Sequence, residues 1–168
     1  MAKKVNGKQK GNSFERDVAN MLSERFERAT GVEKGFRRNP DSGSFFGGKN
    51  IARTETYDTD YAIYGDLICP RNFKFSIECK HYKTAPPLNA LLKGQVQQWD
   101  DWLGQASQDA KASDKNMFLL IKYNYTEAMV FTDEELFGNI DPIFIWDGQY
   151  FVYILKDVLE LDDEVFFN

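Results

Sequence analysis

Two carboxylates and a lysine stand at a spacing that suits phosphodiester chemistry: Asp66, then Glu78 and Lys80. Carboxylate oxygens are ligands of Mg²⁺ or Mn²⁺ in sites that keep several waters, and such an ion polarises a phosphate and acidifies an attacking water. The ammonium group of Lys80 would orient that water or stabilise the phosphate as its charge grows. The three residues together indicate metal-dependent cleavage of a phosphodiester.

Residues 73–80 are predicted to form the strand that carries Glu78 and Lys80. Apolar and polar side chains alternate along it, which places Glu78 and Lys80 on one face. Residues 62–68 form a second predicted strand, and a turn at residues 69–72 would fold it antiparallel onto the first, with Asp66 beside Glu78. A second interpretation stays open, because charged residues are also common on the solvent face of an amphipathic strand.

An amphipathic helix is predicted near the N-terminus, because apolar residues recur there at helical spacing. These residues are Phe14, Val18, Leu22 and Phe26. Glu15 flanks this stripe, and two roles remain open for it. It could close a capping box with Asn12 at the start of the helix, or it could share in the metal site directly or through water.

Several motifs in a fixed order resemble the PD-(D/E)XK nuclease superfamily. They are a Gly-x-x-Phe-Glu-Arg helix start at residues 11–16, a Phe-Arg-Arg-Asn-Pro-Asp-Ser-Gly-Ser loop at 36–44, Gly-Asp-Leu at 65–67 and Ile-Glu-Cys-Lys at 77–80. Their order is most similar to archaeal-type Holliday junction resolvases and small phage relatives. The resemblance covers roughly residues 10 to 125 and rests on several motifs together, which is more specific than any one alone.

The resemblance implies roles for individual residues. Glu15 matches the helix glutamate, Asp66 and Glu78 match the metal-binding acids, and Lys80 matches the catalytic lysine. Cys79 matches the middle residue, whose backbone carbonyl completes the metal site. The implied cofactor is Mg²⁺, with Mn²⁺ as a substitute. One departure is the residue before Asp66, which is glycine where proline is common in the superfamily, and no motif is transferable after about residue 125.

Charge is distributed unevenly although the chain carries a net charge of −5. Residues 1–53 hold 12 Lys and Arg against 6 Asp and Glu, whereas residues 54–168 hold 9 against 20. The basic part could follow DNA phosphates in a salt-sensitive way. We expect residues 1–11 to form a flexible basic arm, which is either a DNA clamp or only a solubilising tail.

Residues 37–50 form a glycine-rich loop with arginines and hydroxyl groups. Such a loop could hold a DNA backbone next to the cleaved bond, because glycines allow close approach and the other side chains neutralise or donate to phosphate oxygens. A plain connecting loop is the other interpretation. No Gly-Lys-Ser/Thr pattern follows, so we expect no nucleotide cofactor. The candidate DNA-binding residues, from the arm to the end of this region, are Lys10, Arg37, Arg38, Ser42, Ser44, Lys49 and Arg53.

A long helix is predicted at residues 88–112, after Pro86 and Pro87. Its expected buried stripe is Val96, Trp99, Leu103, Ala106 and Ala110. Superfamily members often place a helix glutamine near the active site, and Gln105 is the tentative candidate, with an ordinary solvent-facing position as the alternative. Strands are then expected at residues 117–123 and 127–132, and a hairpin at residues 143–155 around Asp147-Gly148. We expect the C-terminal third to be structural or dimeric, because its end is acidic.

Length and composition fit a single domain over residues 12–168, since 168 residues with 42% hydrophobic content can bury a core without disulfides. Cys69 and Cys79 lack metal-ligand spacing, which argues against zinc and favours a reducing cytoplasm. No apolar run is long enough to span a membrane, and no signal-peptide pattern follows Met1.

We therefore expect an α/β fold like that of restriction endonucleases, with a mixed central sheet flanked by helices and an added C-terminal hairpin. The expected function is Mg²⁺-dependent cleavage of four-way or other branched DNA by a homodimer. Two alternatives remain: a restriction or repair nuclease for linear or nicked duplexes, and a non-catalytic DNA-binding protein that keeps the nuclease fold.

Overall fold

The computed structural model describes residues 7–40 and 61–168, and the side chains of residues 11–40 and 65–168. In chain order, the described elements are α1 (Gly7–Arg25), α2 (Glu27–Thr30), β1 (Arg37–Arg38), β2 (Tyr61–Tyr64), β3 (Leu67–Pro70), β4 (Phe75–Tyr82), α3 (Leu88–Leu92), α4 (Gln97–Ser113), β5 (Asn116–Tyr123), β6 (Met129–Thr132), β7 (Phe144–Trp146), β8 (Tyr150–Ile154), α5 (Leu155–Val158) and a final 3₁₀ turn (Asp163–Val165).

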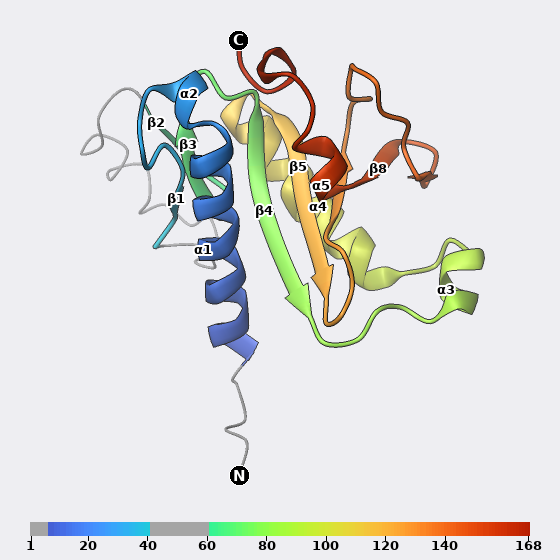
Figure 1. The fold of residues 1–168 in the computed structure, drawn as a ribbon. Helices are drawn as coiled ribbons and strands as arrows, with labels where there is room; N and C mark the ends of the chain where they lie inside the picture. Colours follow the sequence, from blue (N-terminus) through green and yellow to red (C-terminus); the bar gives the residue numbers. More distant parts are fainter. Residues whose placement is uncertain (1–6, 41–60) are drawn as a thin grey trace.

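The described strands form two sheets (Figure 1). The larger sheet has the order β4-β5-β6-β8-β7; β4 and β5 are parallel, and the other neighbours are antiparallel. The smaller sheet is antiparallel, with the order β1-β3-β2. Strand β4 is therefore an outer strand of the larger sheet, and α4 lies in the crossover that returns the chain to β5.

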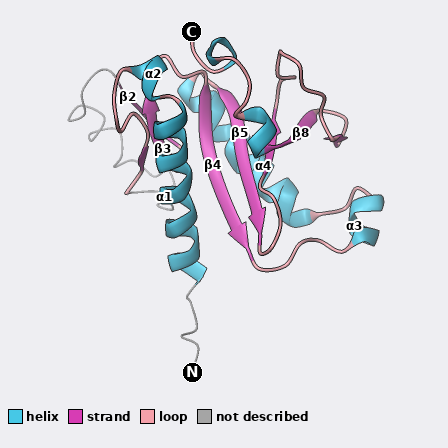
Figure 2. Ribbon diagram, viewed as in Figure 1, coloured by secondary structure: helices cyan, strands magenta, loops and turns pink. Residues whose placement is uncertain are grey.

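Helices cover both faces of the larger sheet, α1 on one face and α4 on the other (Figure 2). Odd-numbered residues of β4, such as Phe75 and Ile77, pack in one core with Phe14 and Leu22 of α1. The second core joins α4 to the opposite face of β5 and β6, around Trp99. The expected α/β class, with a mixed sheet flanked by helices, is confirmed, and the hairpin β7–β8 extends the same sheet.

Two predicted helix boundaries were wrong. Helix α1 begins at Gly7, before the expected start near Asn12, because the intervening Lys and Gln residues are good helix formers. The predicted helix over residues 88–112 is broken between α3 and α4. Gly94 has a φ of +61° there and ends α3, and Leu88 and Leu92 are exposed instead of continuing the buried stripe.

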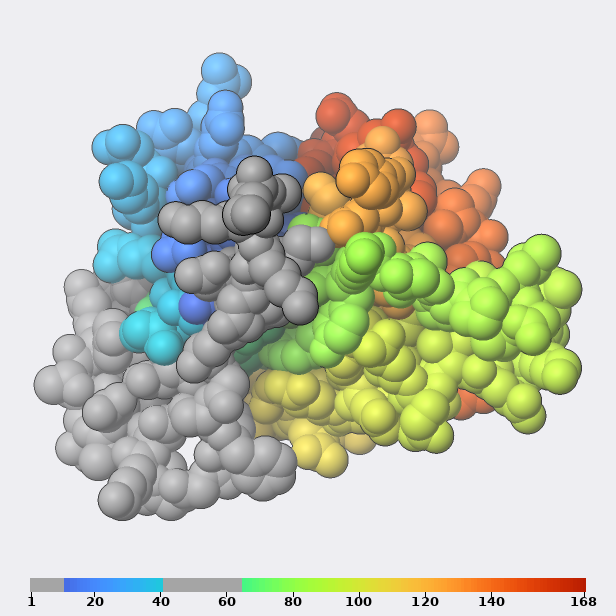
Figure 3. Space-filling model, turned by 90° about the horizontal axis from the view of Figure 1, so that it is seen from below, coloured from blue at the N-terminus to red at the C-terminus, as the bar shows by residue number. Residues whose placement is uncertain are grey.

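The carboxyl ends of β4 and β5 lie together at one end of the molecule. Figure 3 views this end, where the green residues that follow β4 lie beside the orange residues of the β5–β6 turn. The backbone supports this closeness, because the N–H of Asn124 donates to the carbonyl of Tyr82 at 3.2 Å. None of the described helices is long and apolar enough to cross a membrane.

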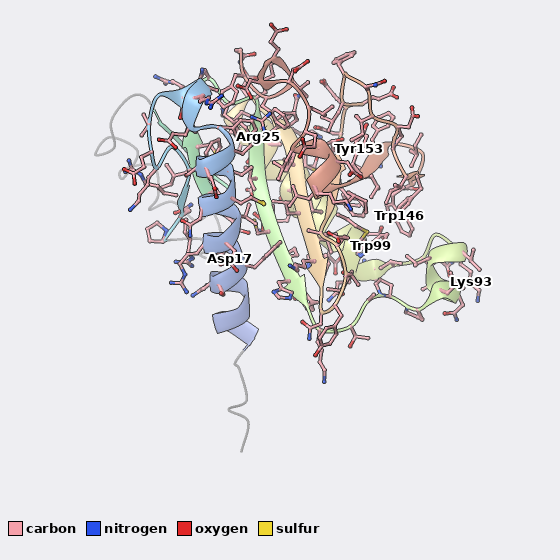
Figure 4. All side chains as sticks on the ribbon, in the orientation of Figure 1. Asp17, Arg25, Lys93, Trp99, Trp146 and Tyr153 are labelled. Carbon is pink, nitrogen blue, oxygen red and sulfur yellow. The ribbon has the colours of Figure 1, made fainter. Side chains whose placement is uncertain are left out.

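The C-terminal segment closes the opposite end of the core. Phe166 packs against Phe26 with ring centroids 4.8 Å apart, and its carbonyl accepts from the N–H of Lys74 at 2.7 Å. Arg25, labelled in Figure 4 at the end of α1, forms an ion pair with Asp163 at 2.7 Å. This segment therefore has a structural role, one of the two expected for the C-terminal third.

Candidate active site

Strand β4 carries Glu78 and Lys80 on the face that α4 covers. The predicted alternation is correct, but the polar face is not the wet face of an amphipathic strand. Glu78 is only 3% exposed, and its Oε1 atom lies 2.5 Å from Nζ of Lys80. A carboxylate at this depth requires a partner, and the strand supplies one two residues away.

Asp66 reaches β4 from the loop of a tight hairpin. Tyr64 of β2 pairs with Leu67 of β3, so Gly65 and Asp66 are the two loop residues. The predicted strand over residues 62–68 is thus two strands, and its predicted antiparallel pairing with β4 is wrong. Instead, Gly65 forms a parallel bridge with Ile77, because β3 takes β1 and β2 as its partners.

Gly65 is required by the close approach of this loop to β4. Its φ is +70°, and a Cβ atom built on it would lie 2.3 Å from the carbonyl oxygen of Ile77. The proline that is common here in the superfamily has a φ fixed near about −65° and could not adopt this conformation. The departure noted in the sequence is therefore a requirement of the local backbone.

Asn39 holds both carbonyls of the loop. Its backbone N–H donates to the Asp66 carbonyl at 2.8 Å, and its Nδ2 donates to the Gly65 carbonyl at 3.0 Å. In a continued parallel ladder, the Cys79 N–H would donate to the Asp66 carbonyl. The Asp66 carboxylate takes that place instead: its Oδ2 accepts from Cys79 N at 2.8 Å.

The Cys79 carbonyl faces the same edge of β4 as Asp66. The N–H and C=O of one strand residue point to the same side, and the Cys79 N–H points to Asp66. The Ile77 carbonyl, two residues earlier, likewise accepts from the Asp66 N–H at 2.8 Å. An oxygen atom of the backbone thus lies on the Asp66 edge of β4, next to Glu78.

Burial disfavours the charged form of both carboxylates, Asp66 and Glu78. Burial raises the pKa of Asp66 to about 6, and the charges of Glu15 and Asp109 raise it further. The Cys79 N–H and the charge of Lys80 lower this pKa, but they do not outweigh burial. Burial and the charge of Asp66 raise the pKa of Glu78 to about 8, against its ion pair with Lys80. Two such groups favour a bound cation, because a cation removes the mutual repulsion and compensates the lost hydration.

Gln105 of α4 contacts both Glu78 and Lys80. Its Nε2 donates to Glu78 Oε1 at 2.8 Å, and its Oε1 accepts from Lys80 Nζ at 3.2 Å. Burial alone would lower the pKa of Lys80, but the charge of Glu78 and the hydrogen bond to it outweigh burial and raise that pKa. Lys80 is therefore held as an ammonium group.

Glu15 is buried on α1 and pairs with Arg38 of β1. Arg38 Nε lies 2.6 Å from Glu15 Oε2, and its Nη2 donates to Asn12 Oδ1 at 3.1 Å. The capping-box interpretation is wrong, because α1 starts at Gly7 and both Asn12 and Glu15 lie inside the helix. Glu15 is close enough to Asp66 for its charge to raise the pKa of that group.

A comparison with known families agrees with this constellation. The model of a family described as "Phage putative PDDEXK endonuclease" matches residues 6–157, which is most of the chain. The chain belongs to this family. No curated protein and no solved structure matches it. Membership in this family of PD-(D/E)XK endonucleases supports a nuclease that binds DNA.

Nucleases of this superfamily generally use divalent metal ions. Within the described residues, no three side chains of the His, Cys, Asp or Glu type gather closely enough to hold a metal ion. The site offers two carboxylates, Asp66 and Glu78, and the Cys79 carbonyl on the same edge. That set fits Mg²⁺, which keeps several waters and is commonly held by one or two carboxylates together with substrate phosphates.

The structure describes the side chains of only two of the candidate DNA-binding residues, Arg37 and Arg38. Arg37 is exposed on β1, and its Nε donates to the Lys34 carbonyl at 3.2 Å, whereas Arg38 is committed to Glu15 and Asn12. Lys10 lies in α1, where only its backbone is described. Ser42, Ser44, Lys49 and Arg53 lie outside the described residues. A phosphate-binding role for these residues stays a prediction.

Sequence reasoning missed Asn39 and Asp109. Asn39 lies in the loop that the sequence singled out, but it holds a hairpin loop 26 residues away, and such a contact leaves no local sequence pattern. Asp109 lies one helical turn after Gln105, and its charge raises the pKa values of Asp66 and Glu78. The spacing of Gln105 and Asp109 on one helix face was the available signal.

Proposed function

We propose that this chain is a metal-dependent endodeoxyribonuclease in which Asp66, Glu78 and the Cys79 carbonyl hold Mg²⁺. The observation that carries the proposal is that the Asp66 carboxylate is held by the Cys79 N–H, next to Glu78 and close enough for its charge to raise the pKa of Glu78, while Lys80 pairs with Glu78 at 2.5 Å. When bound, the ion would polarise the phosphate and acidify the attacking water. Mn²⁺ is the expected substitute because it takes the same oxygen ligands.

The remaining residues position the reacting groups or neutralise charge on the phosphate. Lys80 orients the nucleophilic water or offsets the growing charge of the phosphate, and Gln105 keeps its ammonium group beside Glu78. Glu15 assists from α1, where Arg38 fixes its carboxylate. Asn39 fixes the loop that presents Asp66. These residues lie on α1, on β1 and just after it, on β4, on α4 and in the β2–β3 loop, so the site depends on packing of both helices against β4.

We further propose that the substrate is four-way or other branched DNA and that the enzyme acts as a homodimer. The order of the sequence motifs, which is similar to archaeal-type Holliday junction resolvases, supports this substrate. Strand β7 supports a dimer, because it is an outer strand of the described sheet and exposes Phe144 and Ile145, and Ile143 just before it is exposed as well. The acidic C-terminal end, by contrast, would repel DNA.

The test is to incubate the purified protein with linear, nicked, flap and four-way DNA of matched sequence, with and without Mg²⁺. We expect cleavage only with the metal, and fastest on the four-way substrate. Equal cleavage of linear duplex would favour a restriction or repair nuclease. Binding to DNA with no cleavage under any divalent ion would favour a non-catalytic protein that keeps the nuclease fold.

A further inference from the structure

Two exposed tyrosines, Tyr82 and Tyr125, lie at the carboxyl ends of β4 and β5, and Tyr82 is two residues from Lys80 of the proposed active site. Tyr82 ends β4 and is in register with Tyr123, the last residue of β5. Tyr125 follows in the β5–β6 turn, whose Asn124 N–H donates to the Tyr82 carbonyl. The backbone therefore places the two exposed rings on neighbouring segments.

Tyr82 lies next to Lys80 and packs on α4. The two residues share one face of β4, and two residues of strand span about 6.6 Å. The Tyr82 ring packs against Trp102 of α4, with centroids 4.7 Å apart and planes tilted by 44°. Trp102 is buried, whereas Tyr82 is 44% exposed. One side of the tyrosine ring thus rests on the core while the rest is presented to solvent.

Tyr125 has no structural reason to be a tyrosine. It is 104% exposed, so its ring adds nothing to either core, and its φ is +63°. The left-handed region is unfavourable for a bulky side chain, and glycine or asparagine would fill such a turn at lower cost. A large exposed aromatic side chain in an unfavourable conformation points to a task outside the fold.

Three lysines lie at the same end of β4 and β5 as the two tyrosines. Lys80 shares the Tyr82 face of β4, Lys83 follows Tyr82 and is exposed, and Lys122 of β5 is half-buried at the same end but on the opposite face of the sheet. Glu127 is the carboxylate in the β5–β6 turn. Aromatic rings beside lysines suit a single strand of nucleic acid, because bases stack on the rings and the ammonium groups meet phosphates.

We propose that Tyr82 and Tyr125 form a stacking platform for unpaired bases of a DNA strand that flanks the cleaved phosphate. The position of that phosphate rests on the proposed nuclease function, but the platform itself does not. Bases inside a continuous duplex are already stacked on one another and cannot reach the rings. The platform therefore selects DNA with unpaired nucleotides next to the site, such as gaps, flaps or open branch points.

Binding without metal tests the platform independently of cleavage. A fluorescent single-stranded oligo-dT and a blunt duplex of equal length are titrated in EDTA with the wild type, Tyr82→Ala, Tyr82→Phe and Tyr125→Ala. Each alanine variant should bind oligo-dT about tenfold more weakly, as expected for the loss of one stacked base, and the duplex with little change. Tyr82→Phe should keep wild-type affinity because it keeps the ring.

Phe137→Ala is the matched control. Phe137 is an exposed aromatic residue that follows β6 at the other end of the sheet, so its loss should not change either affinity. Tyr125→Ala cannot disturb packing because the side chain is fully exposed, and thermal melting checks the fold of Tyr82→Ala. Oligo-dT affinities of both alanine variants within about twofold of wild type would overturn the platform, as would equal weakening by Phe137→Ala.

Cleavage separates the two proposals. With Mg²⁺, the wild type should cut a gapped duplex faster than a continuous one, and the alanine variants should lose that preference. A protein that cuts nothing but whose alanine variants lose oligo-dT binding would refute the nuclease and keep the platform. A protein that cuts DNA but whose alanine variants bind oligo-dT normally would keep the nuclease and refute the platform.

Discussion

The Asp66 carboxylate stands in for a backbone carbonyl in the ladder of β4: its Oδ2 accepts from the Cys79 N–H at 2.8 Å, while the Asp66 carbonyl accepts from Asn39. This hydrogen bond fixes one carboxylate oxygen of Asp66 against the backbone of β4. The carboxylate is therefore positioned before any substrate arrives, which is the arrangement that electrostatic catalysis requires.

Asp66→Asn should abolish cleavage and leave the fold and DNA binding largely intact. The amide oxygen can still accept from Cys79, but the negative charge that would hold the metal is gone. We expect cleavage to fall by at least about two orders of magnitude, measured on a labelled substrate with Mg²⁺. Glu78→Gln should behave in the same way, whereas near-normal turnover of either variant would remove that residue from the mechanism.

Metal-free stability should fall as the pH rises from about 4 to about 8. The pKa of Asp66 rises from 3.8 to about 6 on folding, and that of Glu78 from 4.5 to about 8. Across this range the unfolded chain binds fewer protons than the folded one, so the free energy of unfolding decreases with pH. Chemical denaturation in EDTA at a series of pH values measures the slope.

The same series should show a smaller decrease for Asp66→Asn, because that variant lacks one buried ionising group and lessens the repulsion on Glu78. Above pH 6 or so the variant should be the more stable protein without metal. Added Mg²⁺ should stabilise the wild type and not the variant. A wild-type stability that rises between pH 5 and 8 would contradict the raised pKa values.

Gly65→Ala should destabilise the protein more than Gly148→Ala. Both glycines have left-handed backbones, with φ of +70° and +65°, so both variants lose about 1–2 kcal/mol from conformation. Only at Gly65 does the new Cβ meet a backbone oxygen, whereas nothing lies within 4 Å at Gly148. Overpacking should add about 1–3 kcal/mol at Gly65, measured by denaturation. Equal losses of stability in the two variants would show that the β2–β3 loop can shift away from β4 at little cost.

The two parts of the site differ in how far the sequence could predict them. Alternation is a local property, so the faces of β4 and the shared side of Glu78 and Lys80 followed from it. The partner of a strand is not local. The predicted antiparallel pairing of Asp66 with Glu78 was wrong, because β3 pairs with β1 and β2 and Asn39 bonds to the loop that carries Asp66. The burial of Glu78 was missed for the same reason, since α4 approaches from a separate segment of the chain.

Glu15→Gln should raise the Mg²⁺ concentration needed for half-maximal cleavage several-fold, with a smaller effect on the rate at saturating Mg²⁺. The variant keeps the shape of the side chain but removes a negative charge that acts on Asp66. Arg38→Gln is the paired variant for comparison, because it removes the cation that pairs with Glu15 and keeps the Glu15 charge. An unchanged Mg²⁺ dependence in Glu15→Gln would show that Glu15 serves only to pair with Arg38.

Cutting two strands of a junction in one encounter needs two active sites, and one chain with one site can supply them most simply through a twofold interface. Strand β7 offers exposed apolar residues at the edge of the described sheet, among them Ile145, which is 51% exposed. Ile145→Lys should therefore convert a dimer to a monomer in sedimentation and abolish paired incisions, without loss of folding, because lysine is well tolerated on an edge strand.

Mixing the wild type with Glu78→Gln protein tests whether the two sites act together. Heterodimers hold one working site, so a four-way junction in a supercoiled plasmid should be nicked on one strand and give the open circular form. Homodimers of the wild type should give the linear form. Linear product in proportion to the wild-type fraction alone would mean that each chain acts independently. A monomer at micromolar concentration with DNA present would overturn the resolvase proposal and favour a nuclease that makes single incisions.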